Sequence, residues 1–184
     1  MKKITQILGL FILVLSLNSC EKDTLSFDFP LPDKDVCLPP NPYYGPEQYF
    51  TFTVTNADLN AAATVAKLDL NTLKSAKLTK ATIEVTSTGL TLDEIQNVSL
   101  YARATGLGTP TSSNKGMQVA YTGTIAAGAT SINLELNGTQ LLSLFENNKD
   151  AEFVIEVLNK DRTSTGGTPQ VCIKMKNATL GLSN

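Results

Sequence analysis

Histidine and tryptophan are missing from the 184-residue chain, and cysteine occurs only three times. Without histidine, neither a Ser-His-Asp nor a Cys-His catalytic arrangement can form. The common tetrahedral zinc site is excluded as well, because so few thiols without imidazole cannot supply four ligands. No Walker A or GxGxxG phosphate-binding motif occurs. The sequence therefore predicts no metal, no cofactor and no enzymatic activity.

Basic clusters and long helical periodicity are also lacking. The net charge is −2, and no stretch concentrates lysine or arginine as a nucleic-acid-binding surface requires. Threonine is frequent and stands in alternating runs with apolar residues, which favours strands. The composition thus predicts an all-β protein with no nucleic-acid partner.

The N-terminus has the pattern of an export signal. Lys2 and Lys3 precede an apolar run over residues 7–17, which is shorter than the roughly 20 residues of a membrane-spanning helix and suits a secretory signal. The run ends in Leu17-Asn18-Ser19-Cys20, which resembles the lipobox of bacterial lipoproteins. The resemblance implies removal of residues 1–19 and acylation of Cys20, so that lipid anchors the chain to the outer membrane. The alternative is an ordinary signal peptide followed by an incidental cysteine.

Three segments are expected: a signal peptide at 1–19, a lipidated, proline-rich tether at 20–48, and one domain at 49–184. Proline cannot donate to a sheet ladder, so within the tether only Leu25–Phe29 is predicted as a strand, at an edge. From residue 49, short alternating segments separated by turns predict an antiparallel β-sandwich or jelly-roll of about eight or nine strands.

Strand patterns are clearest at residues 49–55, where Phe50, Phe52 and Val54 share one face. Further strands are expected at 64–70, 77–86 and 98–102, and residues 56–63 are expected to form a loop or a single helical turn. Residues 117–125 and 131–137 are predicted to pair as a hairpin, and 152–158 with 170–175 as a final strand pair. A bulge is expected at Asn177-Ala178.

Cys37 and Cys172 remain once Cys20 is acylated, and an even pair in an exported protein is a disulfide candidate. Val171, Ile173 and Met175 alternate with Cys172, so its sulfur is expected on the outer face of its strand. It could reach Cys37 if the proline-rich segment crosses that sheet face. The alternative is two free thiols.

Tyrosines next to rigid prolines form the candidate binding cluster. Exposed rings of Tyr43, Tyr44 and Tyr49 would offer a preformed contact surface for a glycan or an envelope protein. The alternative is that these rings only cover the end of the sandwich. Asp23-Thr24-Leu25 resembles the acceptor motif for O-glycosylation in Bacteroidetes-type bacteria, which makes Thr24 a candidate modification site.

Two further patterns are weak. Asp33 with Asp35, and Asp93 with Glu94, are carboxylate pairs of the kind that glycoside hydrolases use, but such pairs are common on surfaces. The segment 112–115, Ser-Ser-Asn-Lys, matches the S-x-x-K motif of penicillin-binding proteins without the partner motifs of that family. Both are interpreted as incidental.

The segment Leu73–Ala104 resembles small β-sandwich lipoproteins of Bacteroidetes-type bacteria, a group without an assigned activity. Glu21-Lys22-Asp23 resembles the charged export signal of their surface lipoproteins, which leaves both the periplasmic and the cell-surface side open. Three functions follow in order of preference. They are a non-enzymatic binding or structural component of the envelope, a carbohydrate-binding surface lipoprotein, and a carboxylate-based glycoside hydrolase.

Overall fold

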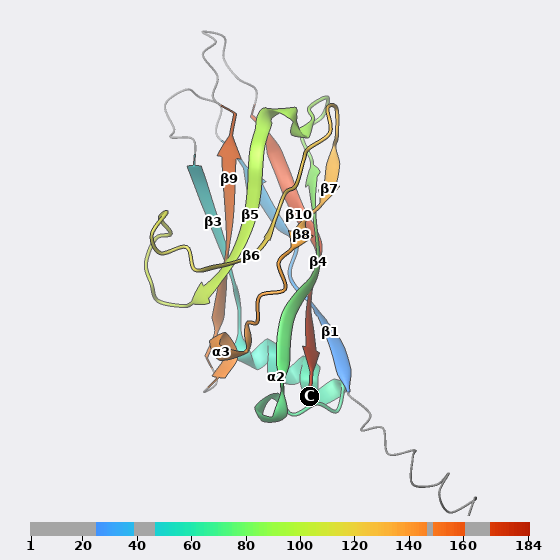
Figure 1. Ribbon diagram of the computed structural model, residues 1–184, viewed down its shortest axis with the longest axis vertical. Helices are drawn as coiled ribbons and strands as arrows, with labels where there is room; N and C mark the ends of the chain where they lie inside the picture. The colour runs from blue at the N-terminus through green and yellow to red at the C-terminus, as the bar shows by residue number, and fades with distance from the viewer. Residues whose placement is uncertain (1–24, 39–46, 147–148, 161–169) are drawn as a thin grey trace, which may run out of the picture.

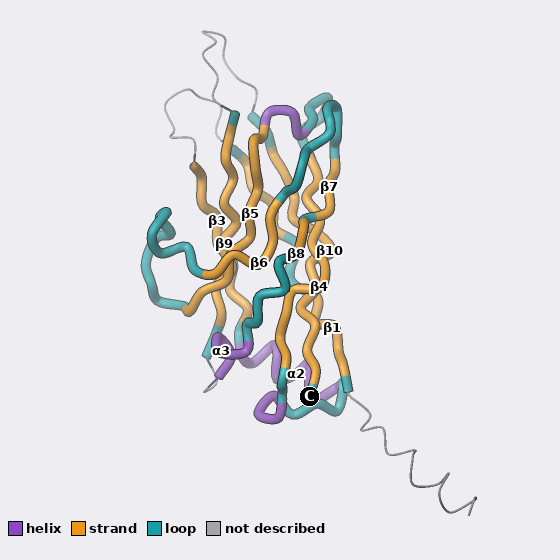
Figure 2. Tube along the Cα trace, viewed as in Figure 1, coloured by secondary structure: helices purple, strands orange, loops and turns teal. Residues whose placement is uncertain are grey.

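Two antiparallel β-sheets share one hydrophobic core and form the body of the molecule (Figure 1; Figure 2). The computed structural model describes residues 25–38, 47–146, 149–160 and 170–184. This part of the chain contains ten strands, where the sequence predicted eight or nine. The prediction of an all-β antiparallel sandwich is confirmed.

Sheet A is built around the long strand β10. One side of β10 pairs with β4, the other side pairs with both β1 and β2, and β7 pairs with the far side of β4. The strands of this sheet are β1 (Ser26–Pro30), β2 (Lys34–Cys37), β4 (Ser75–Val85), β7 (Ser131–Asn133) and β10 (Cys172–Ser183).

Sheet B has the order β3-β9-β5-β6-β8, so β9 and β5 are central. Its strands are β3 (Glu47–Val54), β5 (Ile95–Ala104), β6 (Met117–Tyr121), β8 (Glu135–Leu136) and β9 (Ala151–Asn159). The predicted inward face of β3 is confirmed: Val54 is buried, and Phe50 and Phe52 pack against the core. The rings of Phe52 and Phe153 stack with their centres 5.3 Å apart.

The N-terminal arm, residues 26–37, lies along one edge of β10. Ser26 is opposite Ser183 at one end of that strand, and Cys37 is opposite Cys172 at the other. The predicted edge strand at 25–29 corresponds to β1. The sandwich nevertheless begins before the expected boundary at residue 49, because β1 and β2 use the free backbone groups of β10 and both belong to sheet A.

The arm ends in a disulfide between Cys37 and Cys172, whose Cα atoms are 4.0 Å apart. Ile173 and Met175 are buried while Cys172 is half-buried, so the predicted facing of the cysteine is correct. The expected route was wrong, since the proline-rich segment does not cross the sheet face to reach it. The bridge instead joins two directly opposed residues of neighbouring strands within sheet A.

Helix α2 (Asn56–Val65) replaces the expected loop at 56–63 and ends inside the expected strand at 64–70. Thr55 caps it by accepting a hydrogen bond from the backbone N–H of Asp58, a typical N-cap. Leu59 and Ala63, one helical turn apart, are buried against the end of the core. None of the helices in the described ranges combines the length and apolar character needed to cross a membrane.

The predicted hairpin of residues 117–125 and 131–137 is confirmed in part, because β6 pairs antiparallel with β8. The predicted pairing of 152–158 with 170–175 is wrong. In residues 131–137, β7 joins sheet A and β8 joins sheet B, because the chain passes from one sheet to the other at the buried Leu134. β9 and β10 also lie in different sheets. Short helical segments complete the ends of the sandwich: η1 (Leu70–Thr72), η2 (Leu92–Glu94) and α3 (Leu142–Phe145).

Candidate binding face on sheet B

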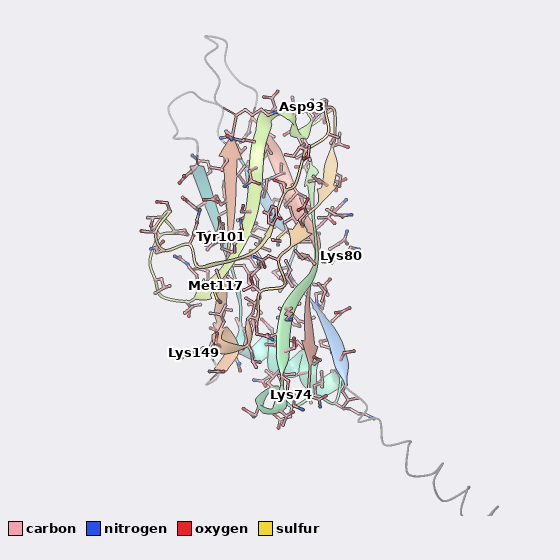
Figure 3. All side chains as sticks on the ribbon, viewed as in Figure 1. Lys74, Lys80, Asp93, Tyr101, Met117 and Lys149 are labelled. Carbon is pink, nitrogen blue, oxygen red and sulfur yellow. A yellow bond between two sulfur atoms is a disulfide. The ribbon has the colours of Figure 1, made fainter. Side chains whose placement is uncertain are left out.

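The outer face of sheet B carries polar side chains that are nevertheless buried. On β5 and β9 the inward positions are apolar, so the alternate positions point away from the core. Glu156 is 3% exposed and Arg103 is 2% exposed, although both occupy outward positions. Charged groups are seldom buried to this extent without partners. Their environment therefore defines the candidate site, which lies around Tyr101 in Figure 3.

Glu156 of β9 is held from two directions. The hydroxyl of Tyr101, on the neighbouring strand β5, donates to one carboxylate oxygen at 2.9 Å. The ammonium of Lys115 donates to the other at 2.5 Å. The same Lys115 nitrogen lies 4.6 Å from the centre of the Tyr101 ring, which adds a cation–π contact. These three groups satisfy one another and form one rigid unit.

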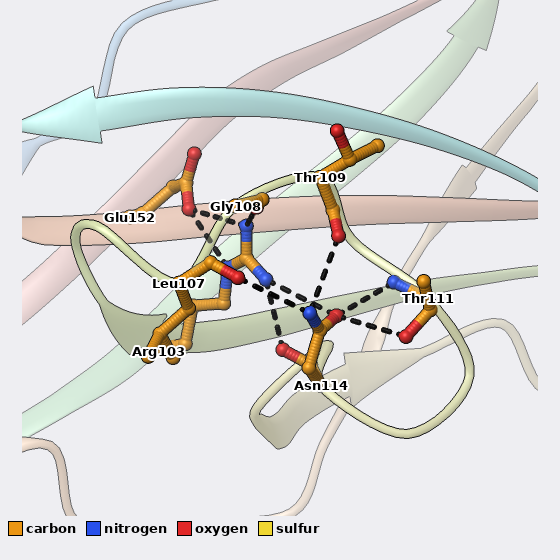
Figure 4. Close-up of polar contacts among 7 residues, drawn as sticks. All are labelled: Arg103, Leu107, Gly108, Thr109, Thr111, Asn114 and Glu152. Carbon is orange, nitrogen blue, oxygen red and sulfur yellow. Dashed lines mark hydrogen bonds and ion pairs between the residues drawn. The ribbon is translucent and has the colours of Figure 1, made fainter.

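The loop that supplies Lys115 is fixed to the sheet by Arg103 (Figure 4). The guanidinium contacts Glu152 of β9 through two nitrogens, both at 2.7 Å. Its remaining N–H groups donate to the backbone carbonyls of Asn114 at 2.9 Å and Gly108 at 2.5 Å. A single buried cation therefore ties both ends of the loop, residues 105–116, to the two central strands of sheet B.

Asn114 organises the interior of this loop (Figure 4). Its side-chain oxygen accepts hydrogen bonds from the backbone N–H and the hydroxyl of Thr111, and its amide nitrogen donates to the carbonyls of Leu107 and Thr109. The S-x-x-K match falls here: Ser112 lies in a turn, and Lys115 is bound to Glu156. The loop therefore has a definite conformation supported by its own side chains.

Two ionisable groups on this face have shifted pKa values. Burial raises the pKa of the Tyr49 phenol, and the hydrogen bond to Glu47 and the charge of Glu156, which is opposite Tyr49 in register, raise it further. For Lys115, partial burial lowers the pKa, but hydrogen bonds to Glu156 and Tyr101 and the attraction to both raise it above its ordinary value. At neutral pH, Tyr49 is therefore protonated and Lys115 is charged.

A row of amide and hydroxyl groups extends the face along β5 and β6. Asn97 and Gln118 both donate to the hydroxyl oxygen of Ser99, at 3.0 and 3.1 Å. Thr122 donates to the side-chain oxygen of Asn97 at 2.5 Å. Ser99 and Thr122 are buried, so the row exposes only parts of Asn97 and Gln118. Together with the partly exposed Tyr49, these amides are groups of the kind that recognise peptides or sugars.

The residues predicted from the sequence have different outcomes. Cys20, Thr24, Tyr43 and Tyr44 lie outside the described residues. Tyr49 lies on the edge strand β3, with its hydroxyl donating to Glu47 at 2.6 Å.

The remaining groups of the face were not predicted from the sequence. The signal was present, since charged and aromatic residues alternate with the apolar core positions of β5 and β9, but alternation alone does not show which outward residues meet. The missed residues are Tyr101, Arg103, Lys115, Glu152 and Glu156.

The carboxylate pairs noted in the sequence do not converge on this face. Asp35 is opposite Lys174 on β10, with the charged atoms 3.5 Å apart. Asp93 accepts hydrogen bonds from Thr91 and from the backbone N–H of Gly128, which ties two turns together. In the described ranges, no group of three or more acidic or cysteine side chains is placed to hold a metal ion.

A hollow lies at the α2 end of the sandwich. It has a volume of about 260 Å³ and lies between α2, η1 and α3. Its apolar lining comes from Leu70, Leu73, Leu142 and Phe145. It is therefore separate from the sheet B face.

No family model matches the chain, and neither a curated protein nor a solved structure shows significant similarity to it.

Proposed function

We propose that the protein is a lipid-anchored component of the bacterial cell envelope that acts by binding, through the outer face of sheet B, and not by catalysis. The N-terminal pattern ending at Cys20 supports the lipid anchor. The Cys37–Cys172 disulfide supports export, because disulfides persist mainly in oxidising compartments. The partner is a protein or a glycan of the envelope.

One observation carries the choice of surface: Arg103 and Glu156, both buried on an outward face, hold the loop 105–116 and the Tyr101 ring in one conformation. A surface that is ordered before binding loses little conformational entropy when a partner arrives. Tyrosine is also among the residue types most often found at the centre of interfaces, and Tyr49 on β3 is partly exposed on this face. The face therefore has the rigidity and the composition of a recognition surface.

Binding is favoured over hydrolysis because the ionised groups of the face neutralise each other in pairs. Glu156 is paired with Lys115, and Glu152 with Arg103. A carboxylate that is ionised and fully hydrogen-bonded is a poor proton donor, and glycoside hydrolysis requires one carboxyl group that stays protonated. These pairs support a structural role for both glutamates.

A glycan partner is the second candidate, favoured by the position of Tyr49. Its ring is partly exposed on the edge strand β3, and Glu47 and Glu156 lie beside it. Sugars bind commonly to such an aromatic ring flanked by polar groups. A protein partner and a glycan partner would use the same face, so the test distinguishes them.

The lipid anchor is tested first. We expect the wild-type protein in the membrane fraction of its host and Cys20→Ala in the soluble fraction. A Cys20→Ala protein that stays in the membrane pellet would overturn the anchor.

The binding face is tested by crosslinking in membranes and by binding to a panel of envelope glycans. Tyr49→Ala combined with Gln118→Ala should reduce capture of the protein or glycan partner, whereas Lys80→Ala, on sheet A, should not. Thermal melts confirm that each variant is folded. Equal capture by all variants would overturn the assignment of this face.

A further inference from the structure

The chain leaves the sandwich at a fixed point. The backbone N–H of Leu25 donates to the side-chain oxygen of Asn184 at 3.1 Å, and the N–H of Asn184 donates to the carbonyl of Leu25 at 3.3 Å. Directly after Leu25, residues Ser26–Pro30 pair with β10. The exit point is therefore held beside the C-terminus, at the end of the sandwich that α2 covers (Figure 1).

The distance from this exit to the anchor is short. Cys20 and Leu25 are five residues apart in the sequence, and a fully extended chain spans at most about 3.6 Å per residue, or roughly 18 Å here. The 12-residue strand β10 is about 40 Å long at roughly 3.4 Å per residue. The inference rests on the proposed lipid anchor. With Cys20 held at the bilayer, so short a span keeps the α2 end of the sandwich close to the lipid.

The side chains at this end suit such a position. Five large hydrophobic residues are exposed in the described part of the chain, and two of them, Leu25 and Val65, belong to this end. Val65, the last residue of α2, is 84% exposed, and Leu25 is 44% exposed. Helix α2 packs against β1, the strand that follows Leu25, so both residues lie at the same end of the sandwich. The other three are Leu107, Met117 and Leu136, which lie on loop 105–116 and on strands of sheet B.

The charges at this end are mixed. The segment 56–74, which forms α2, η1 and the turns that follow them, carries both Lys67 and Lys74 and both Asp58 and Asp69. Attraction to anionic lipid requires an excess of basic side chains near the surface. The apolar side chains and the short tether, and not charge, therefore distinguish this end.

We infer that the α2 end of the sandwich faces the lipid bilayer, with Leu25 and Val65 in contact with the lipid surface. The opposite end, which carries Asp93 and the turn after β4, points away from the membrane (Figure 3). The strands stand upright on the bilayer, and the outer face of sheet B is open to partners that approach from the side.

Lipid-quenched fluorescence tests this orientation. The full lipidated protein is reconstituted into phosphatidylcholine vesicles that contain doxyl-labelled lipid. A single cysteine is introduced by Val65→Cys, Lys80→Cys or Thr88→Cys and labelled with bimane, while the native disulfide stays oxidised. All three positions are exposed, and they lie at the α2 end, along the side, and in the turn after β4. We expect quenching several-fold stronger at position 65 than at positions 80 and 88.

The outcomes separate the two proposals. A protein that does not float with the vesicles would overturn the lipid anchor and, with it, the orientation. Flotation with equal quenching at all three positions, or with stronger quenching at position 80 or 88, would overturn the orientation alone. Quenching at position 65 that appears only after anionic lipid is added would overturn the apolar contact.

Discussion

The ammonium nitrogen of Lys115 lies 2.5 Å from a carboxylate oxygen of Glu156 and closes a network on the outer face of sheet B. The two residues are 41 positions apart in the sequence. Lys115 comes from a surface loop, whereas Glu156 stands in the middle of a central strand. The contact converts a charge that would be costly to bury into a fixed part of the surface.

Removing the charge of Lys115 should destabilise the protein. Lys115→Met leaves the Glu156 carboxylate buried without its cation, and we expect a loss of about 1–3 kcal/mol, reduced from the full value for a buried pair because Lys115 is partly exposed. Chemical denaturation of Lys115→Met, Glu156→Gln and the double variant measures the coupling. The double variant should recover part of the loss. Additive effects of the two single changes would contradict the pairing.

Alkaline pH should destabilise the fold through Tyr49 and Lys115. Both pKa values are raised in the folded state, so the unfolded chain releases these protons first, and the stabilisation is present below about pH 10 and decreases as the pH rises beyond it. The denaturant concentration at the unfolding midpoint should therefore decrease as the pH is raised from about 10 to about 11.5. Tyr49→Phe should make this fall shallower. An identical pH profile for Tyr49→Phe and wild type would exclude Tyr49 as a source.

The disulfide should contribute strongly to stability. The bridge joins residues 135 positions apart, and the chain-entropy model predicts a contribution of about 4–5 kcal/mol for a loop of this size. Cys37→Ser/Cys172→Ser and the reduced wild type should both unfold at a lower denaturant concentration, by similar amounts. Native protein that takes up two equivalents of an alkylating reagent without prior reduction would refute the bridge.

Gly116, at the end of loop 105–116, should not tolerate alanine. It has a φ angle of 95°, and an added Cβ would lie 2.4 Å from the carbonyl oxygen of Ala102. Gly106 in the same loop also has a positive φ but has open space around it, so it is the matched control. We expect Gly106→Ala to cost about 1 kcal/mol and Gly116→Ala clearly more. Equal unfolding free energies for the two variants would show that the loop can shift away from the strand.

Local patterns in the sequence predicted local structure well. Alternation over residues 49–55 placed Phe52 and Val54 on the core side, where both are found. The expected bulge in the last strand is present as well. Asn177 adopts a φ of 52°, and the register with β4 shifts between Lys176 and Thr179. These features depend only on side-chain period and on the tolerance of asparagine for left-handed backbone.

Helix α2 and the separation of β9 from β10 could not be predicted from local patterns. Only a few side chains of α2 are buried, so its apolar periodicity is weak, and the alternation at 64–70 imitated a strand. β9 and β10 are consecutive in the sequence but belong to different sheets, and pairing across a sandwich depends on non-local contacts. The site was missed for the same reason, since Lys115 and Glu156 meet only after the loop folds back.

The N-terminal arm has a mechanical consequence under the proposed lipid anchor, which would hold the chain by its first residues. Tension applied at Leu25 along the strand direction would load the hydrogen bonds between β1 and β10 in shear, all at once, and would not unzip them singly. If β1 detached, β2 would take the load next, and the covalent link between Cys37 and Cys172 would stop further peeling. The edge of β10 is therefore held by hydrogen bonds along β1 and β2 and by a covalent bond at its far end.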